Sequence, residues 1–175
     1  WQSGANEGLL VSWIWEPLPH STDLDWPVRF QWASSLWVLQ VLKGLLINGP
    51  GPQLKWPNDV YVGSKKLAGM LIEIQWQQQR PRLGVFGLGL NLNQRQFSSE
   101  LRSAISLAGF GMPWVDPLEA FQWFQSTLPE GLDQWIQMPG KELKKAYERA
   151  LLGMGEWHYF EKDGNRWNAQ IVGVN

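Results

Sequence analysis

The stretch Lys55-Trp56-Pro57-Asn58-Asp59-Val60-Tyr61-Val62 is followed, two residues later, by Lys65-Lys66-Leu67-Ala68-Gly69. Together they place three lysines, an amide and a carboxylate around one tight turn inside apolar sequence. Charged groups on a half-buried sheet contribute little to packing, and their burial is costly unless a counter-charge is present. An anionic ligand, such as a phosphate or a carboxylate, is therefore the natural partner of these lysines.

Composition narrows the classes of protein that the chain can belong to. It has 175 residues, of which 44% are hydrophobic, so we expect one sizeable core and perhaps a small appendage in addition. A formal net charge of −1 gives no global basic field for nucleic acid. No apolar run is long enough for a transmembrane helix. The start at Trp1 is not a signal peptide, and we expect that the chain is cut from a longer protein.

The chain has no cysteine, which excludes disulfides, thiolate metal sites and a cysteine nucleophile. This composition fits a cytoplasmic location. His20 and His158 are far apart in sequence, so we do not expect a histidine zinc site. Any metal is expected to arrive with the phosphates of a ligand, as Mg²⁺ often does.

Hydrophobic patterning predicts both strands and helices. Strands are expected over 8–16, 54–56, 60–62, 66–76, 83–92, 157–161 and 167–174. Helices are expected over 28–47, 117–136 and 140–150. Asp25 is the expected N-cap of the first helix, with Pro27 at its start. Lys162-Asp163-Gly164-Asn165 is typical of a hairpin turn.

Three segments in series resemble the catalytic domain of the biotin protein ligase family. They are Lys55-Trp-Pro-Asn-Asp, Lys66-Leu-Ala-Gly69 and Gly87-Leu-Gly89-Leu-Asn91-Leu-Asn93, and their order and spacing match that family. Ala104-Ile-Ser-Leu resembles a segment that the family places after its last strand. The tail, 153–175, resembles the start of the family's SH3-like C-terminal domain.

This resemblance implies an α+β fold with a mixed, largely antiparallel sheet and helices packed on one side, plus a partial SH3-like β segment. Residues 1–150 would be the catalytic domain, incomplete at its N-terminus, and 151–175 the start of the truncated small domain. In the family a glycine- and arginine-rich loop ends just before a tryptophan, which here is Trp1. We therefore expect this chain to hold part of the site.

The resemblance also implies an activity. Such a protein is an ATP-dependent ligase that forms biotinyl-5′-AMP and transfers biotin to a lysine of the biotin carboxyl carrier protein of acetyl-CoA carboxylase. ATP, biotin and Mg²⁺ are the implied ligands, and neither nucleic acid nor a membrane is expected as a partner of this chain. A lipoate or octanoyl ligase relative, a non-catalytic binding module on the same scaffold, and a homodimer all remain open.

Lys66 matches the family lysine that bridges the biotin carboxylate and the α-phosphate, so it is the candidate catalytic residue. The residues implied to bind biotin are Lys66, Gly69, Leu71, Gly87 and Gly89. Taken without the resemblance, the lysine is an ordinary solvated hairpin residue. The glycines are likewise ordinary strand glycines, and the leucine an ordinary core residue.

The residues implied to bind ATP or the adenylate are Trp1, Lys55, Asn58 and Asn91. Trp1 would stack on adenine, Lys55 and Asn58 would contact phosphates, and Asn91 would bind the adenine edge, since an amide both donates and accepts. The alternatives are an edge-strand lysine for Lys55, a turn-former for Asn58 and a capping residue for Asn91. Asp59 is a candidate for Mg²⁺, although a role in the turn is favoured.

Overall fold

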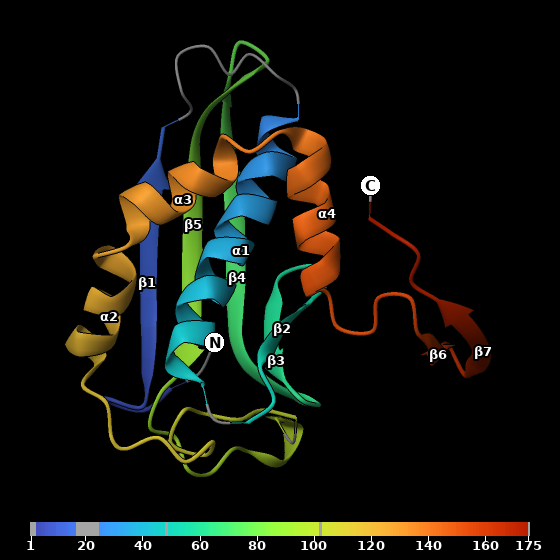
Figure 1. Cartoon of the computed structure of the whole chain (residues 1–175). Helices are drawn as coiled ribbons and strands as arrows, with labels where there is room; N and C mark the ends of the chain where they lie inside the picture. The colour runs from blue at the N-terminus through green and yellow to red at the C-terminus, as the bar shows by residue number, and fades with distance from the viewer. Residues whose placement is uncertain (1–2, 17–24, 48, 102, 175) are drawn as a thin grey trace.

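The computed structural model describes residues 3–16, 25–47, 49–101 and 103–174, which form two layers (Figure 1). One layer is a five-stranded antiparallel sheet with the strand order β1-β5-β4-β3-β2. The helices cover one face of this sheet, and a two-stranded hairpin follows at the C-terminal end. The predicted α+β class, with helices on one side of a largely antiparallel sheet, is confirmed.

The main sheet contains β1 (Gly8–Trp15), β2 (Pro52–Lys55), β3 (Asp59–Val62), β4 (Lys65–Gln77) and β5 (Arg80–Asn91). The helices are α1 (Trp26–Leu45), the short η1 (Ser99–Leu101), α2 (Pro117–Gln125), α3 (Leu128–Ile136) and α4 (Gly140–Ala150). The hairpin consists of β6 (Trp157–Lys162) and β7 (Asn165–Gln170). Each predicted strand is present, with its bounds shifted by a few residues.

Helix α1 is the central element of the helical layer and begins where the sequence predicts a start. Asp25 is its N-cap residue and Pro27 lies in its first turn, although the Asp25 side chain makes no capping hydrogen bond. Trp26 and Trp37 are buried against the sheet, as expected for packing residues. Burial of a large apolar side chain stabilises the fold by roughly 1.5–3 kcal/mol.

The prediction of one helix over 117–136 is wrong, because α2 ends at Gln125 and α3 begins at Leu128. Pro129 lies in the first turn of α3. Proline has no N–H to donate and its ring clashes with the preceding turn, so a single helix cannot continue through it. The hydroxyl of Thr127, at the break, accepts a hydrogen bond from Trp37 Nε1 (3.1 Å) and ties the break to α1.

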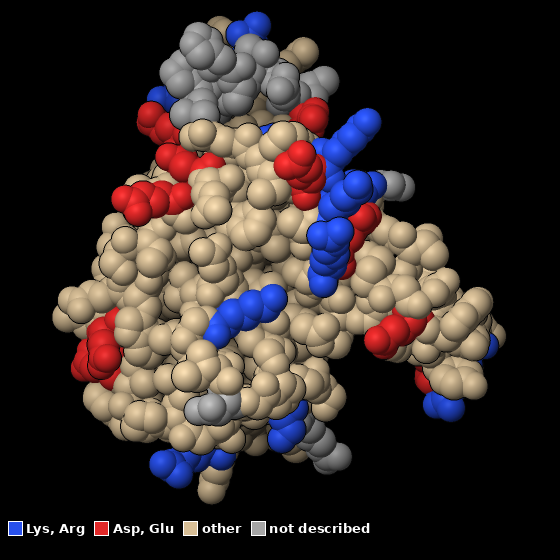
Figure 2. Space-filling view, viewed as in Figure 1, with Lys and Arg blue, Asp and Glu red and all other residues tan. Residues whose placement is uncertain are grey.

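The last helix, α4, is attached to the outer edge of the sheet. Leu151, its C-cap residue, forms a parallel bridge with Leu54 of β2, and the Leu152 N–H donates to the Leu54 carbonyl at 2.6 Å. Figure 2 shows lysine and arginine side chains gathered along the outer side of this helix. Lys141, Lys145 and Arg149 of α4 are exposed, and Lys144 is half-buried.

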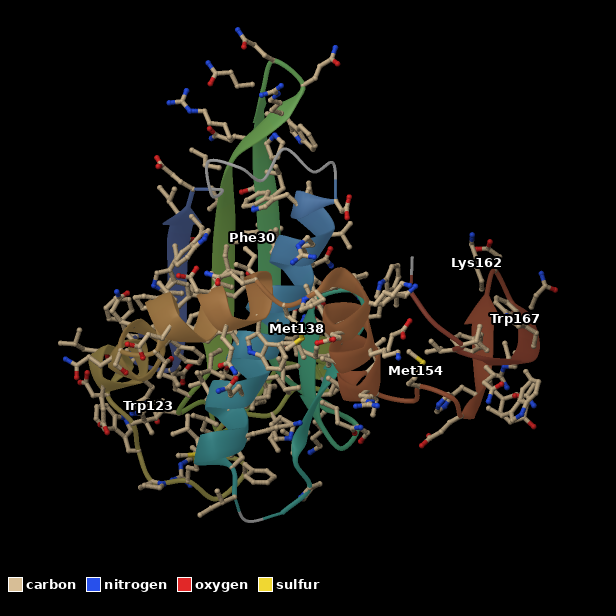
Figure 3. The ribbon with its side chains drawn as sticks, turned by 45° about the horizontal axis from the view of Figure 1, so that its top comes forward. Phe30, Trp123, Met138, Met154, Lys162 and Trp167 are labelled. Carbon is tan, nitrogen blue, oxygen red and sulfur yellow. The ribbon has the colours of Figure 1, made fainter. Side chains whose placement is uncertain are left out.

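The C-terminal hairpin stands apart from the two layers. Figure 3 labels Lys162 and Trp167 on it, well away from Phe30 and Trp123 in the main body. The predicted turn is confirmed, with Asp163 and Gly164 both at positive φ as a tight hairpin turn requires. The predicted strand 167–174 is wrong in extent, since β7 begins at the turn and ends at Gln170. The division into domains at 150 and 151 stays a prediction.

Among the described residues, no helix combines the length and the apolar character needed to cross a membrane.

Candidate active site

The face of the sheet opposite the helices carries a hollow of about 580 Å³. The residues lining it come from β1, β3, β4, β5 and the turn before β3. They include all five of the residues predicted to bind biotin, namely Lys66, Gly69, Leu71, Gly87 and Gly89. Asn58 and Asp59 line the same hollow. The tertiary structure thus brings together residues from three separate sequence segments.

Glycines form the floor of this hollow because of how the strands pair. Gly69 of β4 lies opposite Gly89 of β5, and that glycine lies opposite Leu10 of β1. Paired residues of neighbouring strands share a face, so two bare backbones adjoin one exposed leucine. A neighbouring row consists of Leu71, Gly87 and Ser12. The floor of the hollow is therefore apolar and has room for a ligand.

A side chain at Gly87 would fit the fold but fill part of this floor. A Cβ built there lies 3.5 Å from Ser12 Oγ and 3.7 Å from Leu71 Cβ, which are ordinary contact distances. Leu10 and Leu71 are 58% and 59% exposed, so the apolar walls of the hollow face open space. Exposed leucines beside bare backbone are typical of a site that takes an apolar ligand body.

The charged end of the hollow is an ion pair. Lys66 Nζ lies 2.6 Å from Asp59 Oδ1, and both side chains are partly buried. A charge-assisted contact of this length holds the ammonium group in place. An anionic ligand that reaches Lys66 would therefore share the ammonium group with the Asp59 carboxylate.

The backbone of Lys66 is held by the segment that follows β5. The Lys66 N–H donates to the Ser103 carbonyl (2.6 Å), and the Ile105 N–H donates to the Lys66 carbonyl (2.9 Å). This segment contains the Ala104-Ile-Ser-Leu motif, and Ala104 forms a parallel bridge with Lys66. The motif that the sequence singled out thus supports the candidate catalytic lysine.

Asn91 fastens that same segment to the sheet. Its side chain is buried, and Nδ2 donates to the Ile105 carbonyl at 2.9 Å. Its backbone carbonyl accepts from the Leu107 N–H (3.1 Å), and Asn91 is not among the described residues that line the hollow. The structure gives Asn91 a role in holding this loop, and binding of adenine stays a prediction.

Asn58 joins the turn to β4 through two hydrogen bonds, one that it donates and one that it accepts. Its side-chain Nδ2 donates to the Met70 carbonyl (2.5 Å), and its own carbonyl accepts from the Met70 N–H (2.8 Å). The turn-forming role is therefore present, while Asn58 also lines the hollow.

The preceding residue of the turn is held from the helical side. The Pro57 carbonyl accepts hydrogen bonds from the Tyr147 hydroxyl of α4 and from Gln31 Nε2 of α1, both at 3.1 Å. Tyr147 is buried, and this burial raises its pKa to about 12, so the hydroxyl is a donor throughout the neutral range.

Lys55 lies beside the hollow but does not line it. It pairs with Asp59 across the β2–β3 hairpin, so both side chains are on the open face. Its Nζ lies 4.6 Å from the centre of the Tyr61 ring and donates to the Tyr61 hydroxyl at 3.3 Å. Of the two lysines expected to share one hollow, Lys66 lines it, whereas Lys55 lies beside it on Tyr61. Lys65 is exposed, as predicted.

Two further predictions concern Trp1 and a bound metal ion. Trp1 lies outside the described residues. In the described part of the chain, no cluster of three or more histidine, aspartate and glutamate side chains could hold a metal ion. Asp59 is thus a single carboxylate, and its contact with Lys66 favours its role in organising the turn and the pair.

Sequence reasoning missed Leu10, Ser12, Gln31 and Tyr147. The alternation within the predicted strand 8–16 already places Leu10 and Ser12 on one face, but it does not tell which strand lies beside them. Tyr147 is 90 positions from Pro57 in sequence, so no local pattern points to their contact.

The chain is similar in sequence to proteins of a known family. The sequence profile of the Biotin/lipoate A/B protein ligase family matches residues 2–91, which is half of the chain. The bifunctional ligase/repressor BirA of Bacillus subtilis is 27% identical over 160 residues, and so is that of Bacillus spizizenii. The match covers 89% of this chain and 47% of each BirA, so the chain spans about half the length of these relatives.

Solved structures share the fold. The apo biotin protein ligase of Aquifex aeolicus superposes with a TM-score of 0.74 at 26% identity, over 97% of this chain and 72% of that one. The same Aquifex protein in complex with biotin and ATP gives a TM-score of 0.72 at 24% identity, over 97% and 68% of the two chains.

Proposed function

The chain belongs to the biotin/lipoate A/B protein ligase family, and we propose that the protein is an ATP-dependent ligase that joins biotin to a carrier domain. The observation that carries the proposal is the Lys66–Asp59 pair at one end of a glycine-floored hollow. This arrangement suits a small acid whose carboxylate reacts while its apolar body lies on the sheet.

In the first step, one carboxylate oxygen of biotin attacks the α-phosphorus of ATP. An O–P bond forms, the bond to the β-phosphate bridge breaks, and pyrophosphate leaves with the electron pair, giving biotinyl-5′-AMP. Two anions must approach each other, so a fixed cation that lies between them lowers the barrier. Lys66 supplies this cation, and Asp59 holds it in position before the anions bind.

The glycine floor receives the biotin rings. Gly69, Gly87 and Gly89 let the rings approach the backbone, and Leu71 provides apolar contact from the side. The Ser12 hydroxyl lies in the row beyond Gly69 as seen from Lys66, so it can hydrogen-bond a polar group at the far end of the ligand.

ATP would lie on the Lys55 side of the turn. Lys55 and Asn58 are the proposed contacts of the phosphates, Asn91 of the adenine edge, and Trp1 of the adenine face. Mg²⁺ commonly binds through one or two carboxylates together with substrate phosphates, and Asp59 fits one such ligand position. The ion would then neutralise phosphate charge, and it would enter with ATP.

In the second step, the amine of a carrier lysine attacks the activated carbonyl of biotinyl-5′-AMP and AMP leaves. The acceptor amine must lose a proton and be positioned, but the adenylate needs no further activation. The proposed acceptor is the biotin carboxyl carrier protein of acetyl-CoA carboxylase, and the proposed location is the cytoplasm. Residues 1–150 would form the catalytic domain and 151–175 the start of the small SH3-like domain.

A lipoate or octanoyl ligase relative and a non-catalytic binding module are the alternatives. The Lys55-Trp-Pro-Asn-Asp segment favours biotin over lipoate, and the BirA and Aquifex relatives point the same way. The intact Lys66–Asp59 pair favours catalysis over binding alone.

Release of pyrophosphate from ATP, measured with biotin and with lipoate, tests this proposal. We expect release with biotin and little with lipoate. Lys66→Ala should slow the biotin-dependent rate by about 100- to 1000-fold, which is the effect of removing one preorganised electrostatic group.

Lys65→Ala is the matched control, since this neighbouring lysine is exposed and does not line the hollow. Its rate should equal that of the unaltered protein. Equal rates for Lys66→Ala and the unaltered protein would remove Lys66 from the mechanism, and release with lipoate alone would favour the lipoate alternative.

A further inference from the structure

We propose that Tyr147 and Gln31 are positioning residues for the phosphate side of the site, because together they orient the peptide group that links Pro57 to Asn58. This inference rests on the proposed function. It assigns a catalytic consequence to two residues that lie in the helical layer rather than in the hollow.

The contact is a single carbonyl with two side-chain donors. The Tyr147 hydroxyl and Gln31 Nε2 each donate to the Pro57 oxygen at 3.1 Å. A carbonyl oxygen has two lone pairs, so both can be engaged at once. Since the donors come from α4 and α1, the oxygen is held toward the helical side of the sheet.

The direction of the carbonyl sets the direction of the next N–H. The Pro57–Asn58 peptide bond is trans, and in a planar trans peptide the C=O and N–H groups point in opposite directions. The Asn58 N–H is therefore turned away from the helices, toward the face on which Asn58 lines the hollow. Among the described residues no acceptor bonds this N–H, so it remains a donor for an anion beside Lys66.

Tyr147 is held in place by the packing of its ring, and α4 is held by its bond to the sheet. The Tyr147 ring is buried and stacks on Trp32 with 5.6 Å between ring centres. The end of α4 is bonded to β2 through Leu152 and Leu54, next to the turn. The helix that carries Tyr147 is therefore joined to the strand that leads into Pro57.

A purely structural role would give a different result. The hydrogen bond from Gln31 is exposed, so water can replace it at the Pro57 carbonyl with little loss of stability, whereas loss of the part-buried Tyr147 bond costs about 1 kcal/mol. Water does not fix the plane of the peptide, however. The rate of adenylate formation should thus fall although the protein stays folded, which separates positioning from folding.

The test uses Tyr147→Phe, which keeps the stacked ring, and Gln31→Met, which keeps the length of the side chain. Each single variant should lower kcat for pyrophosphate release about fivefold, the equivalent of one ~1 kcal/mol hydrogen bond. The double variant should lose about 25-fold or more. The KM for biotin should not change, because the glycine floor is untouched.

Phe124→Leu is the matched control, since Phe124 is buried in α2 and does not contact the turn. It should lower stability and leave kcat unchanged. A second readout needs no activity: the amide proton of Asn58, followed by NMR, should move downfield when pyrophosphate or AMP is added to the unaltered protein. This response should be weaker in the double variant.

Unchanged kcat in the double variant, or an Asn58 amide that does not respond to either anion in the unaltered protein, would overturn the inference. Failure of the proposed function looks different, because the unaltered protein would then release no pyrophosphate with biotin. In that case the Asn58 amide response still decides whether the turn presents a donor to anions.

Discussion

Alternate residues of β5 form two faces, which differ in the size of their side chains and in their burial. Phe86, Leu88 and Leu90 point to the helices and are buried. Gly87 and Gly89, between them, point to the open face and line the hollow. Since the pleat sends neighbouring residues to opposite sides, one strand can serve the core and the site at the same time.

The comparison teaches that stability and ligand binding are separated at the scale of a single residue. The helix-facing side has large apolar side chains that exclude water, whereas the open side has glycines, which leave room for a ligand. Substitutions of adjacent residues should therefore affect different quantities, the free energy of unfolding at one residue and the affinity for the ligand at the next.

The largest effect is expected at Phe86. It is 2% exposed, and its ring packs against Trp13 and Trp37, with ring centres 5.6 and 5.9 Å apart. Phe86→Ala should lower the free energy of unfolding by about 3–5 kcal/mol, because it removes buried area and leaves a cavity. Denaturant unfolding measures this. A loss below ~1 kcal/mol would show that the helix-facing side is loosely packed.

The next effect is a fall in the free energy of unfolding at high pH, which follows from the burial of Tyr147. Burial raises the pKa of Tyr147 from 10.0 to about 12, so the unfolded chain releases this proton first as the pH rises. The stabilising contribution is complete below pH 10 and declines as the pH approaches 12. The loss is on the order of 3 kcal/mol.

The unaltered protein and Tyr147→Phe should be compared by urea unfolding at pH 8 and at alkaline pH. The difference between them cancels the titration of the other tyrosines and of the lysines. A difference that stays constant from pH 8 to pH 11 would contradict the burial of this hydroxyl.

The smallest effect is expected at Gly87. Gly87→Ala should weaken biotin binding about tenfold, ~1.4 kcal/mol, because the added methyl group fills part of the floor. Stability should stay level or rise by up to about 1 kcal/mol, since alanine loses less backbone entropy on folding than glycine. Calorimetry with biotin measures the first quantity and denaturant unfolding the second. Lower stability with unchanged binding would reverse the assignment of the two faces.

Much of the site could be predicted from the sequence because its residues lie in short motifs. Lys66 and Gly69 share one motif, and Gly87 and Gly89 share another, and the resemblance of these motifs to the biotin protein ligase family indicates a lysine beside bare backbone. The single helix predicted over 117–136 was wrong because hydrophobic spacing continues through Pro129, although proline is well tolerated only in the first turn of a helix.

Other features could not be predicted because they depend on long-range contacts. The buried amide of Asn91 bonds Ile105, a position that only the return of the chain after β5 brings near. In the same way, Lys55 turned out to lie over Tyr61 rather than in the hollow, since the position of a strand edge follows from the pairing of all five strands.

By itself, the sequence determined which residue types lie at each strand and turn, because side-chain alternation and turn chemistry are local. It therefore indicated an anionic ligand near the lysines. Only the tertiary structure decided that Lys66 is held by Asp59, that Ser12 adjoins the glycine floor, and that Tyr147 reaches Pro57. These contacts follow from strand register and helix packing, and both are set by burial of the whole core rather than by any short segment.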